Sequence, residues 1–125
     1  MAFDDNSDTI ARDETHDLIS SDKVEGTVAY NRQGERLGTI SSFMVGKRDG
    51  RVKYAVLSFG GLFGLGDRHH PVPWGVLTYD TGQGGYVIDL DKEILKNSPS
   101  YERGREPTYD RAYGEQVYGY YGLPF

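Results

Sequence analysis

Residues 52–59, VKYAVLSF, constrain the fold of this chain more than any other segment. The segment is rich in β-branched and aromatic residues, which favours a strand, and it follows an Asp49-Gly50 pair typical of a tight hairpin turn. Alternation places apolar side chains on both faces: Val52, Tyr54 and Val56 on one, Ala55, Leu57 and Phe59 on the other. A strand that is apolar on both faces needs cover on both sides. The pattern therefore predicts a small β-barrel with a further segment packed outside it.

Turn signals divide the chain into three parts. Residues 1–20 are polar and acidic without a sustained period, so we expect a flexible N-terminal segment. Residues 21–99 form the barrel domain, with strands predicted at 24–30, 35–47, 52–59, 70–74 and 86–90. A short helical turn is predicted at 91–96, with Asp91 as its N-cap.

Residues 100–125 form a C-terminal extension rich in tyrosine, proline and glycine. From Ser98 onward the chain holds six of its ten tyrosines and three of its five prolines, with no clear helical or strand period. We expect an irregular aromatic tail that either lies over the barrel or binds another chain.

Charge and cysteine content exclude several classes of protein. The net charge of −5 resides in residues 1–23, where seven acidic residues face only Arg12 and Lys23. Because polyanion binding needs a basic stripe, direct nucleic-acid binding is not expected. The chain has no cysteine, which removes disulfides and thiol chemistry and fits a cytoplasmic protein. No apolar run has the length of a transmembrane segment.

Ordered motifs through the middle of the chain resemble the PRC-barrel domain. They are VEGTV at 24–28, GERLGTI at 34–40, DGRVKYAVLSFGG at 49–61 and the Pro73-Trp74 pair. The resemblance covers about residues 22–100, and the whole chain is similar to stand-alone α-proteobacterial PRC-barrel proteins. It implies an all-β fold, a six-stranded antiparallel barrel, with a binding or assembly role and no catalysis.

The same family includes the H subunit of photosynthetic reaction centres and the C-terminal half of a ribosome maturation factor. This sequence lacks the membrane helix of the first and the RNA-processing domain of the second. Neither partner is therefore carried over to this chain.

The stretch at 59–74, FGGLFGLGDRHHPVPW, holds the clearest candidates for chemistry. No long helix can start after its glycines, so a phosphate loop is not expected, and the glycines favour a wide turn. His69 and His70 are weak metal candidates, because neighbouring strand residues point to opposite faces. We expect one imidazole to face the barrel and the other to lie at its rim. No serine has the context of a nucleophile, so we expect a protein that is not an enzyme and has no cofactor.

The leading hypothesis is a cytoplasmic PRC-barrel adaptor, a homodimer that presents aromatic and apolar surface to a protein partner of unknown identity. Its candidate surface comprises Leu62, Phe63, Leu65, Trp74, Tyr118, Tyr120, Tyr121 and Phe125. One alternative is a stress-related protein that binds a small ligand or metal through His69, His70 and Trp74. Another is a ribosome- or RNA-associated accessory module.

Overall fold

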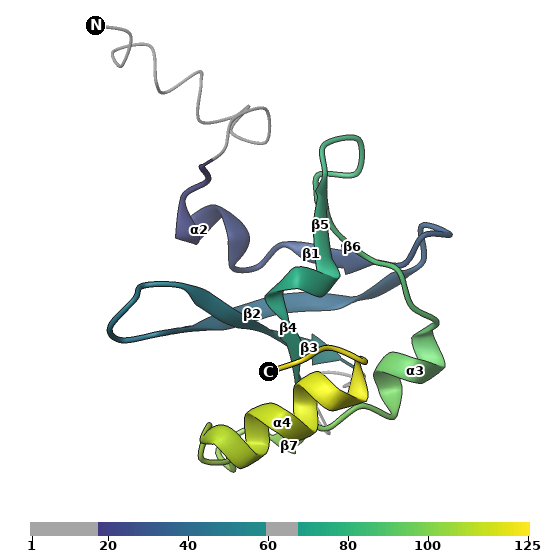
Figure 1. Cartoon of the computed structure of the whole chain (residues 1–125). Coiled ribbons are helices and arrows are strands. Elements are labelled where there is room, and N and C mark those ends of the chain that lie inside the picture. Colours follow the sequence, from purple (N-terminus) through teal and green to yellow (C-terminus); the bar gives the residue numbers. More distant parts are fainter. Residues whose placement is uncertain (1–17, 60–67) are drawn as a thin grey trace, which may run out of the picture.

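The computed structural model describes residues 18–59 and 68–125 (Figure 1). Residues 1–17 and 60–67 lie outside the described part. The expectations for the acidic segment therefore apply mainly to residues that are not described, and the same holds for the glycine run 60–66 and its apolar residues Leu62, Phe63 and Leu65.

The described chain is predominantly β-sheet, as expected, with few helices. Seven strands form one sheet in the order β5-β6-β1-β2-β3-β4-β7. Their bounds are β1 Val28–Tyr30, β2 Arg36–Val45, β3 Val52–Phe59, β4 Arg68–Pro73, β5 Leu77–Asp80, β6 Gly85–Ile88 and β7 Tyr101–Glu102.

This topology does not confirm a six-stranded antiparallel barrel. The sheet has seven strands, β1 and β6 pair in parallel, and β5 and β7 are the two ends of the strand order. The extra strand is β7 in the C-terminal extension, which pairs with Arg68 and His69 of β4. The predicted strand at 24–30 is also shorter than expected, because Ser21–Val24 forms helix α2 and β1 starts only at Val28.

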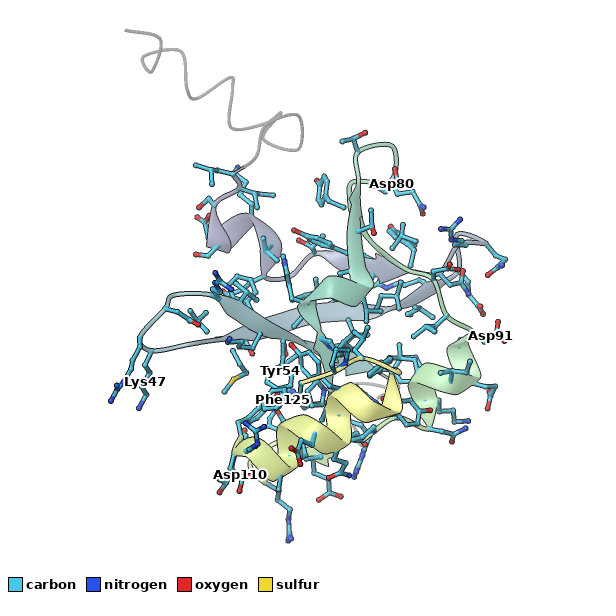
Figure 2. The ribbon with its side chains drawn as sticks, in the orientation of Figure 1. Lys47, Tyr54, Asp80, Asp91, Asp110 and Phe125 are labelled. Atoms are coloured by element: carbon cyan, nitrogen blue, oxygen red, sulfur yellow. The ribbon has the colours of Figure 1, made fainter. Side chains whose placement is uncertain are left out.

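The hairpin of β2 and β3 projects from the body, with Lys47 near its tip (Figures 1 and 2). Gly50 has φ +70° in the turn, as the Asp49-Gly50 pair predicts. The register shifts twice along the hairpin, between Ile40 and Ser42 and between Met44 and Val45. Such irregularities bend and twist a strand, which lets the sheet curl around its core.

Both faces of β3 are covered, as its sequence predicts. Residues of β3 on the inner face join one buried apolar cluster, which comprises Val24, Ala29, Leu37, Ile40, Ala55, Leu57, Phe59, Val72, Tyr86, Ile88 and Leu95. Tyr54 on the outer face is 4% exposed because Tyr109 and Tyr118 pack against it edge to face, with ring centroids 5.1 and 5.6 Å away. The outside cover is thus the C-terminal extension of the chain itself.

The expectation of an irregular tail is wrong, because Arg111–Tyr120 forms helix α4. Asp110 caps this helix by accepting a 2.9 Å hydrogen bond from the backbone N–H of Tyr113. Gly114 faces the ring of Phe125, where a Cβ would collide with it. Glycine is a poor helix former, so the local sequence does not predict this helix, which packing against the rest of the chain stabilises. Figure 2 shows Tyr54 and Phe125 near α4, and Tyr118 contacts both rings.

The short helical turn expected at 91–96 is present as α3, Lys92–Lys96. Asp91 occupies its N-cap position, but its side chain makes no capping hydrogen bond. A 3-10 turn, η2 at Trp74–Val76, links β4 to β5. Within residues 18–59 and 68–125, no helix combines the length and apolar character needed to cross a membrane.

Candidate functional site

The two adjacent histidines of β4 point to opposite faces of the sheet, as alternation predicts. His70 is 2% exposed on the inner face, where its ring lies edge-on to Phe59 with centroids 5.4 Å apart. His69 lies on the outer face and stacks on Tyr101 at 5.7 Å between centroids. The two imidazoles therefore cannot chelate one ion together, and the described residues contain no cluster of metal-ligating side chains.

His70 forms a structural link to Ser98 that superficially resembles a catalytic dyad. Its Nδ1 lies 2.8 Å from Ser98 Oγ, and that hydroxyl donates a 2.7 Å hydrogen bond to the carbonyl of Leu95. Because Ser98 has one hydroxyl proton and gives it to Leu95, Nδ1 of His70 must be the donor to Ser98. A general base needs a free lone pair directed at the serine, so this pair ties β4 to the end of α3 instead of activating a nucleophile.

Burial governs the protonation of His70. Desolvation, and then the nearby charges of Arg68 and His69, lowers the pKa of His70 from 6.5 to about 4. The imidazole is therefore neutral at physiological pH, in agreement with its role as a donor through one nitrogen.

The other predicted surface residues fall in separate places. Trp74 packs against the core and contacts Phe43 and Tyr86, with ring centroids 5.9 and 5.6 Å away. Tyr121 also packs against the core, and burial raises its pKa to about 12. Tyr118 lies against the sheet, whereas Tyr120 and Phe125 are 39% and 49% exposed.

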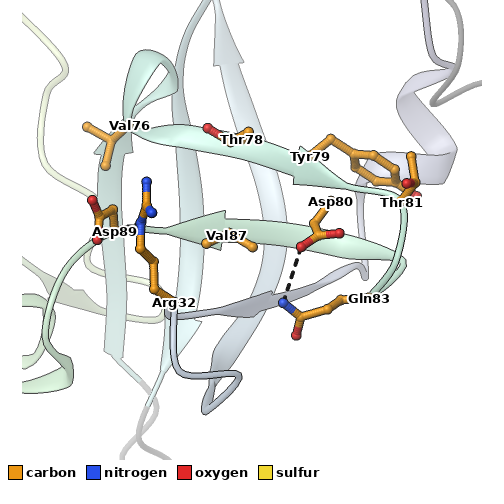
Figure 3. A pocket seen from close by; sticks show the side chains of 9 residues that line it. All are labelled: Arg32, Val76, Thr78, Tyr79, Asp80, Thr81, Gln83, Val87 and Asp89. Carbon is orange, nitrogen blue, oxygen red and sulfur yellow. Dashed lines mark hydrogen bonds and ion pairs between the residues drawn. The ribbon is translucent and has the colours of Figure 1, made fainter.

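One hollow lies over the outer face of β5 and β6 (Figure 3). It has a volume of about 450 Å³ and is lined by Arg32, Val76, Thr78, Tyr79, Asp80, Thr81, Gln83, Val87 and Asp89. Its charged groups are already engaged: Arg32 Nε lies 3.0 Å from Asp89, and Asp80 accepts hydrogen bonds from Gly82 and Gln83. A ligand here would have to compete with these contacts.

A second hollow, the Tyr101 groove, lies on the outer face beside the C-terminal extension. Its volume is about 490 Å³, and it is lined by Ser41, Ser42 and Met44 of β2, Val56 of β3, His69 of β4, and Tyr101, Glu106, Pro107 and Tyr109 of the extension. The groove thus joins four segments that are distant in the sequence.

Aromatic contacts fix the walls of the Tyr101 groove. The hydroxyls of Tyr101 and Tyr109 share a 2.8 Å hydrogen bond, and Tyr109 is held edge to face by Tyr54 and Tyr113 at 5.1 Å. Burial and then the bond to Tyr101 raise the pKa of Tyr109. For Tyr101, burial raises the pKa most, the bond to Tyr109 lowers it, and the charge of Glu106 raises it further. The walls are therefore neutral, rigid rings.

Two polar groups of the groove differ from those in the first hollow because they lack partners. Among the described residues, no hydrogen bond or ion pair engages the exposed carboxylate of Glu106. The Nε2 atom of His69 is buried and likewise has no described hydrogen-bond partner. The Glu106 carboxylate is exposed beside an apolar floor, so a ligand can pair with it, whereas the buried Nε2 atom of His69 offers no accessible surface.

Sequence reasoning singled out His69 only as a weak metal candidate and did not single out the other residues that line this groove. The excess of tyrosines after Ser98 did indicate an aromatic surface. It could not indicate which tyrosines meet β2 and β4, because that depends on where the extension folds back.

Sheet, helices and hollows together define a small domain built mainly of β-sheet. The PRC-barrel domain matches residues 16–95, which is more than half of the chain. The chain belongs to the PRC-barrel domain family. The family resemblance seen in the sequence is thereby confirmed.

Two comparisons add context. An uncharacterized protein of Deinococcus radiodurans is 27% identical over 92 residues, which are 74% of this chain and 30% of that protein. The chain thus spans less than a third of this relative. The crystal structure of RimM from Pseudomonas aeruginosa, described as a putative 16S ribosomal RNA processing protein, aligns with TM-score 0.41 and 20% identity over 62% of this chain and 47% of that one.

Proposed function

We propose that the chain is a non-catalytic protein-interaction module that binds a protein partner in the Tyr101 groove. The observation that carries this proposal is a preformed aromatic hollow of about 490 Å³ whose exposed carboxylate, Glu106, has no described partner. Rigid walls reduce the ordering cost of binding, and tyrosine provides large contact area at low entropic cost.

The groove is favoured over the hollow on β5 and β6 because its one charged side chain has no described partner, whereas the charged side chains of that hollow are paired. In that hollow, binding would displace the Arg32–Asp89 pair and the contacts of Asp80. In the Tyr101 groove, the exposed carboxylate of Glu106 has no described partner that a ligand would have to displace. We include a cytoplasmic location in this proposal because the chain has no cysteine. We also include a homodimer, in which a second copy of the chain is the partner.

The metal or small-ligand alternative has less support from the geometry. His69, His70 and Trp74 lie on the outer face, in the interior and against the core respectively, so they do not converge on one site. Tyr120 and Phe125 remain candidates for a separate contact because both are exposed.

Site-specific photo-crosslinking in the cells that naturally express the chain tests the proposal. A photoreactive amino acid replaces Met44 in the groove or, as control, Thr78 in the other hollow. We expect a discrete protein adduct from position 44 that position 78 does not give. An adduct of twice the 14.0 kDa chain mass would identify a second copy as the partner.

A groove-blocking variant makes the result specific. Ser42→Trp should abolish the adduct from position 44, whereas Thr78→Trp, a matched change in the other hollow, should leave it intact. No adduct from position 44, or an adduct that Ser42→Trp does not affect, would show that the groove is not the contact site.

A further inference from the structure

We infer that the Tyr101 groove accepts an extended, proline-containing peptide segment in the polyproline II conformation, with a lysine or arginine placed against Glu106. This inference rests on the proposed function and specifies its partner. Three features of the groove support it: the paired backbone of its floor, its aromatic and proline walls, and its single carboxylate.

The backbone of Val56 and His69, in the floor of the groove, is already paired on both sides. Val56 pairs with Ser42 on one side and Pro71 on the other, and His69 pairs with Ser58 and Tyr101. A peptide lying over Val56 and His69 therefore finds no free backbone groups in these two interior strands. The polyproline II conformation suits such a site because its backbone stays solvated, and proline brings no N–H that must be satisfied.

The walls have the chemistry that holds proline rings. The lining includes Tyr101, Tyr109 and Pro107 of the extension and Met44 of β2, whereas Val56 is only 2% exposed and adds little surface. Proline-rich segments bind in aromatic-lined grooves because flat rings pack well against pyrrolidine rings and because the peptide is already ordered. The hydrogen bond between the two tyrosine hydroxyls keeps these walls in place before the peptide arrives.

The negative charge of Glu106 favours a positively charged residue in the partner. Glu106 is the only residue of the lining with a formal charge at neutral pH when histidine is neutral, and no described cation pairs with it. A basic residue of the peptide would gain an ion pair there, whereas an acidic residue would meet repulsion. The ion pair is exposed, so its effect on affinity is a few-fold and depends on salt.

Fluorescence anisotropy with three fluorescein-labelled decapeptides tests this inference on the full chain. The probes are APPAPPARRA, the charge-reversed APPAPPAEEA and the flexible AGSAGSARRA. We expect APPAPPARRA to bind at least about three-fold more tightly than either control in low salt. APPAPPAEEA loses the ion pair with Glu106, which contributes up to about five-fold, and AGSAGSARRA loses the preordered proline segment. Equal binding of the three probes, or no binding of APPAPPARRA, would overturn the inference.

Variants assign the binding to the groove. Ser42→Trp should abolish binding of APPAPPARRA, while the matched Thr78→Trp should leave it unchanged. Glu106→Lys alters an exposed side chain, so the fold is retained, and it should invert the preference in favour of APPAPPAEEA. An unchanged preference in Glu106→Lys would refute the role of the carboxylate.

The two levels of the proposal can fail separately. If crosslinking from position 44 traps a partner but no proline peptide binds, the groove is a contact site and its occupant is of another kind. If crosslinking fails as well, the proposed function itself is wrong.

Discussion

The hydroxyl of Tyr118 donates a 2.6 Å hydrogen bond to the backbone carbonyl of Lys53, a residue 65 positions earlier in the chain. This bond joins α4 to β3 at the place where the ring of Tyr118 also packs against Tyr54. The C-terminal helix is therefore part of the folded body and supports the wall of the Tyr101 groove.

Replacing Tyr118 by phenylalanine should lower the free energy of unfolding by about 1 kcal/mol, because the ring remains but the bond to Lys53 is lost. Urea unfolding of the wild type and the variant measures the difference. Tyr120→Phe is the control, since Tyr120 bonds to Ile94 from an exposed position and its loss should matter less. Equal stability of Tyr118→Phe and the wild type would contradict a docking role for this bond.

The two N-cap aspartates should differ in their contributions to stability. Asp110 accepts a hydrogen bond from the N–H of Tyr113, and its replacement by alanine should cost about 1 kcal/mol. Asp91 has no capping bond, so Asp91→Ala should cost clearly less. Thermal unfolding followed by circular dichroism compares the two variants. An equal loss of stability would contradict the prediction, because it would mean that the capping hydrogen bond of Asp110 contributes nothing.

Gly38 should be intolerant of any side chain. A Cβ at this position would collide with the backbone carbonyl of Ser58 on the neighbouring strand, which cannot move without breaking the β2–β3 ladder. We expect Gly38→Ala to destabilise the fold by roughly 2 kcal/mol, as overpacked interiors do. Gly75→Ala is the control, because no atom lies within 4 Å of the place that its Cβ would take, and its effect should stay within about 0.5 kcal/mol. Chemical denaturation of both variants provides the measurement.

Stability should fall in mild acid because of His70. Its pKa is about 4 in the folded chain against 6.5 for an exposed histidine, so the unfolded chain binds more protons between these values. The free energy of unfolding should therefore decrease as pH falls from 6.5 to 4, by up to about 3 kcal/mol from this group. Above pH 6.5 the contribution is constant.

The variants His70→Gln and His69→Gln separate this effect from other titrations. His70→Gln should flatten the dependence of unfolding free energy on pH between 6.5 and 4, and His69→Gln should retain it. A wild-type slope in His70→Gln would mean that another group titrates in this window.

Local features of the fold were predictable because they depend on residues close together in the sequence. The Asp49-Gly50 turn needs only a residue that adopts positive φ, and the opposite orientations of His69 and His70 follow from strand alternation. The two apolar faces of β3 likewise predicted cover on both sides, which the core and the C-terminal extension provide.

Three-dimensional packing decided the rest. Helix α4 contains Gly114 and Gly119, which weaken helix propensity, and it forms because Asp110 caps it and the sheet buries Val117. The Tyr101 groove joins Ser42, His69, Tyr101 and Glu106 from separate segments. Sequence alone predicted β1, β2, β3, β4, β6 and the Asp49-Gly50 turn, because backbone sterics and side-chain alternation act over a few residues, but it did not predict β5 or β7. Only the tertiary structure decided the groove and the mixed seven-stranded sheet, because burial and pairing energies depend on contacts between distant parts of the chain.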